Sequence, residues 1–214
     1  MTADLAPLLP FVVREARGTE VDEAGDVVAT AYLADGLASP RYAARLRASR
    51  ERSELARLVV AVDAAGRVVG TVTYARAGSP LAELCRNDAE ASGSSDGGAR
   101  GGGGARGGGA ASGTGGASGT GGASGDGGAE LRMLGVLPGA RGAGVAEALV
   151  RWCLDTARAD GARRVLLSTQ VQMHAAQRLY ARLGFVRRPD LDWTPEPGVE
   201  LLGLELDLRA QPAA

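Results

Sequence analysis

The chain contains no lysine, so arginine supplies all 24 of its basic side chains. We interpret this bias as a property of the coding sequence and draw no functional conclusion from it. Basic and acidic residues nearly balance, leaving a net charge of −1. A chain with so little net charge has no overall field that attracts nucleic acid or an anionic membrane. We therefore expect neither of these as a partner.

Cysteine, histidine and long apolar runs are also scarce. Cys85 and Cys153 lack metal-ligand or disulfide spacing, which predicts two buried or half-buried thiols and no metal site. No apolar run approaches the ~20 residues that a membrane-spanning helix needs. Residues 1–10 lack the basic start of a targeting signal. These absences lead us to expect a cytoplasmic protein.

One segment lacks large apolar side chains altogether. Between Arg86 and Ala129 no apolar side chain is larger than alanine, and more than half of the 33 glycines fall there. Such a tract buries too little surface to offset its ordering entropy, so we predict a disordered insertion. Lengthening a loop from ~5 to ~44 residues costs only about 2 kcal/mol. We therefore expect one domain, with an N-terminal half at 1–85, the insertion at 86–129, a cofactor-binding C-terminal half at 130–209 and a tail at 210–214.

The rest of the sequence alternates between strand and helix patterns. Strands are predicted at 11–14, 58–63, 67–74, 130–137, 164–168 and 199–208. Helices are predicted at 19–35, 41–57, 145–159 and 173–183, the last ending at Gly184. This order predicts an α/β fold with a mixed central sheet of six to seven strands and helices on both faces.

Residues 130–150 read as a strand, a glycine-rich turn and the start of a helix. Pro138 ends the strand, because proline has no N–H to give to a sheet. The turn Arg141-Gly142-Ala143-Gly144 leads directly into the helix. Backbone amides crowded at such a turn, together with the helix dipole, bind anions. The stretch therefore predicts a phosphate site.

Two motifs resemble those of the GCN5-related N-acetyltransferases. Arg141-Gly-Ala-Gly-Val-Ala146 is similar to the family's R/Q-x-x-G-x-G/A signature, and it follows a strand as it does in that family. Downstream, Ala176-Gln-Arg-Leu-Tyr-Ala-Arg-Leu-Gly-Phe185 is similar to the family's A-x-x-L/F-Y-x-x-L-G-F helix and strand. The resemblance implies the acyl-CoA N-acyltransferase fold, acetyl-CoA as co-substrate, no metal, and an amine acceptor that is a small molecule or a peptide.

The resemblance also assigns roles in cofactor binding. The main chain of Leu134 and Val136 would pair with the pantetheine arm, and the Leu134 amide would polarise the thioester carbonyl. The pyrophosphate would be held by the turn, formed by Arg141, Gly142, Ala143, Gly144, Val145 and Ala146. The amides and Arg141 would have to act jointly, because a helix dipole alone gives only about 0.3–1 kcal/mol.

Two residues take catalytic roles by resemblance, and each has a structural alternative. Glu130 occupies the place of the base that deprotonates the amine, and Tyr180 that of the acid that protonates the departing thiolate. The alternative for Glu130 is a charge at a strand end, and the alternative for Tyr180 is a core tyrosine. Met173 stands where many members have asparagine, which removes one expected polar contact to the CoA arm.

The sequence leaves the roles of two further residues open. His174 either tunes the acceptor pocket or is a surface histidine. Trp193, in a proline-flanked loop, either lines the acceptor site or closes the core.

Three functions are compatible with these patterns. The first is an acetyl-CoA-dependent N-acetyltransferase, as a monomer or a homodimer. The second is a non-catalytic module of the same fold that senses acyl-CoA. The third is a Rossmann-type nucleotide binder, which is disfavoured because Glu147 replaces the third glycine of its motif and the next strand ends without an acidic residue.

Overall fold

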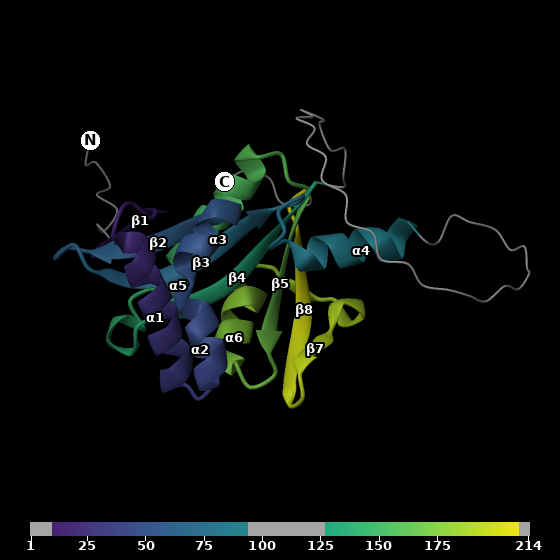
Figure 1. The fold of residues 1–214 in the computed structure, drawn as a ribbon. Coiled ribbons are helices and arrows are strands. Elements are labelled where there is room, and N and C mark those ends of the chain that lie inside the picture. Colours follow the sequence, from purple (N-terminus) through teal and green to yellow (C-terminus); the bar gives the residue numbers. More distant parts are fainter. Residues whose placement is uncertain (1–9, 94–126, 210–214) are drawn as a thin grey trace, which may run out of the picture.

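The computed structural model describes residues 10–93 and 127–209, and its centre is one mixed β-sheet (Figure 1). The strand order is β1-β2-β3-β4-β5-β8-β6, and β7 also pairs with β8. The strands are β1 Phe11–Glu15, β2 Arg57–Asp63, β3 Val68–Arg76, β4 Gly128–Val136, β5 Arg164–Gln170, β6 Val186–Arg187, β7 Trp193–Glu196 and β8 Val199–Asp207. The helices are α1 Glu20–Ala34, α2 Pro40–Arg47, α3 Ser49–Leu55, α4 Glu83–Gly93, α5 Val145–Ala159 and α6 His174–Arg182.

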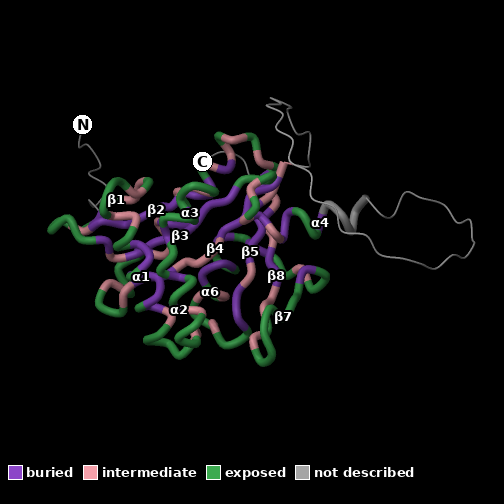
Figure 2. The backbone as a smooth tube through the Cα atoms, viewed as in Figure 1, coloured by how far each residue is buried: buried purple, intermediate pink, exposed green. Residues whose placement is uncertain are grey.

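The sheet is covered on both faces, as predicted. Along β2, Leu58, Val60 and Val62 pack in one buried cluster with α1, while Val59 and Ala61 pack in another with α5. Successive strand residues point to opposite faces, so α1 and α5 lie on opposite sides of the sheet. Figure 2 shows the consequence: the central strands are buried along most of their length, and exposure is concentrated in the loops and on the helices.

The sheet has eight strands, where six to seven were predicted. The extra pairings come from the segment after α6, in which Val186–Arg187 and Trp193–Glu196 both pair with β8. The predicted helix at 41–57 is also divided, since α2 ends at Arg47 and α3 begins at Ser49. At this break the Ser49 hydroxyl donates to the Arg47 carbonyl at 3.1 Å, a local bond that competes with helix continuation.

The disordered insertion stays a prediction, although its first residues, 86–93, belong to helix α4, which spans Glu83–Gly93. The reason is a buried charge: Asp88 is 3% exposed and pairs with Arg164 at 2.5 Å and with Arg188 at 2.7 Å. These pairs attach α4 to the sheet together with Leu84 and Cys85, which pack in a buried apolar cluster with Leu166 and Leu191. Of the rest of the predicted insertion, 94–126 lie outside the described residues, and Gly128 and Ala129 belong to β4.

The path of β4 shapes the functional region. It pairs in parallel with β5 only from Gly128↔Arg164 to Leu131↔Leu167, although both strands continue further. Its pairing with β3 shifts register between Thr71 and Thr73, and Met133 adopts a positive φ of 55° there. This β-bulge turns the strand and re-aims its side chains. Beyond Leu131 the two strands diverge, and α6 lies where they part (Figure 1).

Within the described residues, no helix is both long enough and apolar enough to cross a membrane.

Candidate active site

Two cavities meet beside the bulge of β4. The larger, of about 790 Å3, is lined by β4 from Leu134 to Val136, by the glycine-rich turn and by α6. The smaller, of about 190 Å3, is lined by β4 from Leu131 to Met133, by α2 and by β7. We call them the turn cavity and the small cavity. Tyr32, Leu37 and Met173 line both, so the two cavities adjoin at these residues.

The glycine-rich turn forms one end of the turn cavity. Gly142 and Gly144 have φ angles of 78° and 82°, a region that only glycine adopts without strain. Gly144 is the N-cap of α5 and offers no side chain to the first amides of that helix, which have no intrahelical partner. A Cβ at either glycine would meet no atom within 4 Å. The turn therefore presents free amides and an open surface, as an anion site requires.

Five of the six predicted turn residues line the turn cavity. Arg141, Gly142, Gly144, Val145 and Ala146 line the turn cavity, while Ala143 does not. Arg141 is already engaged, because its Nη1 and Nη2 bind the carboxylate of Asp35 at 2.9 and 3.0 Å. Its Nε also donates to the Val136 carbonyl at 3.2 Å. The cation that was expected to assist the amides is thus paired with a carboxylate of the same cavity.

The edge of β4 supplies the wall next to the turn. The amide of Leu137 donates to the Val69 carbonyl at 2.9 Å, so Leu137 faces β3. Backbone groups of successive strand residues point to opposite edges, so Val136 and Leu134 face away from β3. On that side β5 has already diverged, and both residues line the turn cavity. Their main chains are placed to pair with an extended arm lying in the cavity.

One face of α2 forms a wall of the small cavity. Ser39, Tyr42 and Arg45 line it at a spacing of three residues, which places them on one side of the helix. Trp193 lines the cavity from β7 and is 36% exposed, so its place is the cavity wall and not the core. At about 190 Å3 the space is smaller than the ~300–1,000 Å3 typical of sites for drug-sized ligands. A group about as large as one amino-acid residue fits it better.

The charges of the small cavity differ in their pairing. Arg132 lies 3.3 Å from Glu83 and 3.7 Å from Glu130, and donates to the Leu81 carbonyl at 2.8 Å. Arg45 and Glu196 also line this cavity, and neither has an ion-pair partner among the described residues. They are the charges of this cavity that are available to a ligand.

Glu130 lines neither cavity. It is 2% exposed, and one carboxylate oxygen accepts a hydrogen bond from the Leu84 amide at 2.8 Å, in the first turn of α4. Burial raises the pKa of Glu130 to about 7, and the nearby Arg132 offsets part of that rise. The role of Glu130 as the base stays a prediction, and in the structure this carboxylate is not at a cavity wall. The carboxylate caps α4 and pairs with Arg132.

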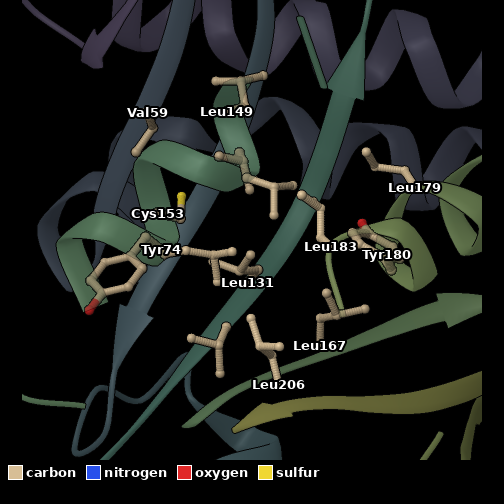
Figure 3. Close-up of a cluster of buried hydrophobic side chains, with 14 of the residues drawn as sticks. Val59, Tyr74, Leu131, Leu149, Cys153, Leu167, Leu179, Tyr180, Leu183 and Leu206 are labelled. Atoms are coloured by element: carbon tan, nitrogen blue, oxygen red, sulfur yellow. The ribbon is translucent and has the colours of Figure 1, made fainter. Parts of the chain in front are cut away.

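Tyr180 also lines neither cavity. It is 5% exposed, and its ring packs edge-on against Phe185 with centroids 5.6 Å apart. Figure 3 shows Tyr180 beside Leu183, on the α6 side of the core cluster. Burial raises its pKa above the usual value for tyrosine. His174 is exposed at the start of α6 and lines the turn cavity but not the small cavity.

The sequence reasoning missed Tyr32 as a site residue, because it treated this tyrosine only as part of a helix face. Tyr32 and Tyr42 line the small cavity with their ring centroids 6.3 Å apart. A compositional signal was present: the chain has only 2 Trp, 4 Tyr and 2 Phe, and with Trp193 three of these line one small space.

Comparison with known proteins identifies relatives. A model described as the acetyltransferase (GNAT) family matches residues 26–185. N-alpha-acetyltransferase 30 of Schizosaccharomyces pombe is 39% identical over 57 residues, a segment that spans 27% of this chain and 38% of that relative.

Two solved structures are similar in fold. One is yncA, a putative acetyltransferase from Salmonella typhimurium with its cofactor acetyl-CoA, at 16% identity and a TM-score of 0.54 over 95% of this chain and 97% of that one. The other is the NatC complex bound to Gag peptide and CoA, at 18% identity and a TM-score of 0.56 over 92% of this chain and 98% of that one.

Proposed function

Because the chain belongs to the acetyltransferase (GNAT) family, we propose that it transfers an acetyl group from acetyl-CoA to a primary amine. The observation that carries this proposal is the junction of the two cavities at Tyr32, Leu37 and Met173. One cavity suits a long phosphorylated donor and the other a small acceptor. Their meeting point lies beside the bulge of β4.

The turn cavity has the features that acetyl-CoA needs. The amides of the Gly142–Val145 turn would hold the pyrophosphate at the N-terminus of α5. The outward main chain of Val136 and Leu134 would bind the pantetheine arm. The arm would then run along β4 toward Met133, which places the thioester near the junction and the Leu134 amide near its carbonyl oxygen.

The small cavity favours an acceptor whose amine belongs to one amino-acid residue. Its volume of about 190 Å3 supports this, as do two relatives: N-alpha-acetyltransferase 30, and the NatC complex, which binds a peptide together with CoA. We propose a peptide N-terminus or a free amino acid as the acceptor class.

The test is turnover by the purified protein with acetyl-CoA and a panel of amines. The panel pairs short peptides with their N-terminally blocked versions, and adds free amino acids and polyamines. Release of the CoA thiol and a mass gain on the free peptide are the expected results, with no reaction of blocked peptides.

Two other outcomes would assign a different function. Tight binding of acetyl-CoA without turnover of any amine would favour the sensor module. Thermal stabilisation by NAD but not by CoA would favour the nucleotide binder.

A further inference from the structure

The walls of the small cavity carry polar groups that no other group of the protein engages. Tyr42 and Arg45 line the cavity from α2, and their side chains make no hydrogen bond or ion pair within the described residues. The hydroxyl of Thr169, which lines the same cavity from β5 and is 3% exposed, also has no partner there. Buried polar groups are nearly always hydrogen-bonded, so groups of this kind at a cavity wall indicate a polar ligand.

A buried cation lies behind the α2 wall. Arg52 of α3 is 5% exposed, and its Nη1 donates to the Arg45 carbonyl at 2.9 Å. Its Nε and Nη2 are buried without a hydrogen-bond partner, and no carboxylate of the described chain forms an ion pair with it. A buried charge without a counter-charge is costly, and arginine does not avoid that cost by losing its proton. The fold therefore keeps an uncompensated positive charge at this place.

The charges around Tyr42 favour an anion as well. Those that act on its hydroxyl come from three arginines and one glutamate, which are Arg132, Arg45, Arg52 and Glu196. Arg132 is paired with Glu83 at 3.3 Å, whereas Arg45 and Arg52 have no such partner. Two unpaired cations thus stand against the carboxylate of Glu196, and the wall at Tyr42 is positive.

We propose that the acceptor carries a carboxylate close to its amine, and that this carboxylate binds the Tyr42 hydroxyl and the Arg45 guanidinium. Arg52 does not touch the ligand and supplies positive charge from behind the wall. The amine would lie toward Tyr32 and Met173, where the two cavities meet. At about 190 Å3 the cavity suits the two groups of one amino-acid residue. This inference rests on the proposed function, because it assigns the small cavity to the acceptor.

Matched acceptors test the proposal and identify the source of the carboxylate. Free amino acids are compared with their amides, and peptides that begin with aspartate or glutamate are compared with those that begin with asparagine or glutamine. The wild type should favour the acidic member of one series by roughly tenfold in kcat/KM, since the neutral member loses a hydrogen bond between charged groups. An amide also changes the pKa of the amine, so each ratio is compared between wild type and variants.

Two substitutions should reduce this preference by roughly tenfold. Tyr42→Phe removes the hydroxyl and keeps the ring beside Tyr32. Arg52→Met removes the buried charge and keeps a long side chain, whereas Arg52→Lys keeps the charge and should retain most of the preference. Arg50→Met is the control, because Arg50 lies on the same helix, pairs with Asp22 and does not line the cavity.

The melting temperature separates an electrostatic role of Arg52 from a structural one. Because its charge is uncompensated in the folded protein, Arg52→Met should keep or raise the melting temperature while the preference falls. If Arg52→Met lowers the melting temperature and leaves the preference unchanged, the role given to Arg52 is wrong.

A binding readout needs no turnover. N-acetylalanine and its amide represent the product of a free amino acid and a neutral counterpart, and N-acetylaspartate amide and N-acetylasparagine amide do the same for a peptide. Calorimetry in the presence of CoA measures all four. In one of the two pairs the acid should bind roughly tenfold more tightly to the wild type and to Arg50→Met. Tyr42→Phe and Arg52→Met should lose this difference.

The outcomes distinguish this inference from the proposed function. If the wild type acetylates amines but favours the acid in neither series, the carboxylate site is wrong and the proposed function stands. If no amine is acetylated, while an acid still binds better than its neutral counterpart and the two variants lose that difference, the carboxylate site stands and the proposed function fails.

Discussion

Arg141 and Asp35 form a two-bond ion pair, at 2.9 and 3.0 Å, that joins the glycine-rich turn to the end of α1. Both side chains are about two-fifths exposed, at 42% and 40%, so the pair itself contributes little to folding stability. Its consequence is electrostatic, because the carboxylate neutralises the one arginine of the turn. A phosphate that binds there has to compete with Asp35 for Arg141.

This competition predicts opposite effects of two substitutions. Asp35→Asn should strengthen acetyl-CoA binding by about threefold to tenfold, because Arg141 becomes available to the pyrophosphate. Arg141→Ala should weaken binding at least tenfold, which corresponds to ~1.4 kcal/mol. Calorimetry with acetyl-CoA measures both, and melting temperatures should stay within a few degrees of wild type. Weaker binding by Asp35→Asn would show instead that Asp35 holds Arg141 or the turn in its binding conformation.

Glu130 predicts a specific pH dependence of stability. Burial raises its pKa from 4.5 to about 7, so the folded protein holds this proton more tightly than the unfolded chain does. The free energy of unfolding should therefore fall as pH rises from about 4.5 to about 7, by roughly 3 kcal/mol in total. Glu130→Gln should remove this fall, while still offering an oxygen to the Leu84 amide.

Urea denaturation between pH 4.5 and 8 measures the difference, with Glu83→Gln as the control because Glu83 pairs with the same Arg132. Equal pH dependence in wild type and Glu130→Gln would contradict the assignment. The same variant tests the role of base, since a loss of kcat beyond about 100-fold would support that role.

The features predicted most accurately are those that depend on residues close together in the sequence. The turn at 141–146 and helix α5 follow from glycine and proline spacing, and both are present. The eighth strand, 193–196, was missed because Pro195 and Pro197 predict a loop there. Only its pairing with β8 makes the segment a strand. Helix α4 was missed because Asp88 is attached by Arg164 and Arg188, which lie far along the chain.

The small cavity could not be predicted for a related reason. It exists because β4 separates from β5 after Leu131 and bulges at Met133, and neither event has a local sequence signature. Helical periodicity predicted that Tyr32 lies on a helix face, but it could not predict that this residue borders a cavity. Its meeting with Met173 and Leu37 depends on how α1, α6 and the strands pack together.

Arg45 predicts a preference among acceptors. It lines the small cavity without an ion-pair partner in the described chain, so it should attract an anionic group on the acceptor. Arg45→Glu should lower kcat/KM for acceptors with a carboxylate by roughly tenfold relative to neutral ones, and favour cationic ones. Arg47→Glu is the control, because Arg47 lies on the same helix but pairs with Asp26 outside the cavity. An unchanged order of acceptors in Arg45→Glu would remove Arg45 from acceptor recognition.

Substitutions of Gly144 test the phosphate site itself, provided that the effect of backbone strain is separated from the effect of an added charge. Its φ of 82° means that any L side chain strains the turn, by about 1–2 kcal/mol. Gly144→Ala carries this strain alone, whereas Gly144→Glu adds a negative charge where the pyrophosphate would lie.

We expect Gly144→Glu to bind acetyl-CoA at least tenfold more weakly than Gly144→Ala, with similar melting temperatures. Gly66 provides the control, since its φ of 78° is similar and it lies in the β2–β3 hairpin away from both cavities. Gly66→Ala and Gly66→Glu should lose similar stability and bind acetyl-CoA like wild type. If Gly144→Glu binds as tightly as Gly144→Ala by calorimetry, the pyrophosphate does not lie at this turn, and the donor site must be placed elsewhere along β4.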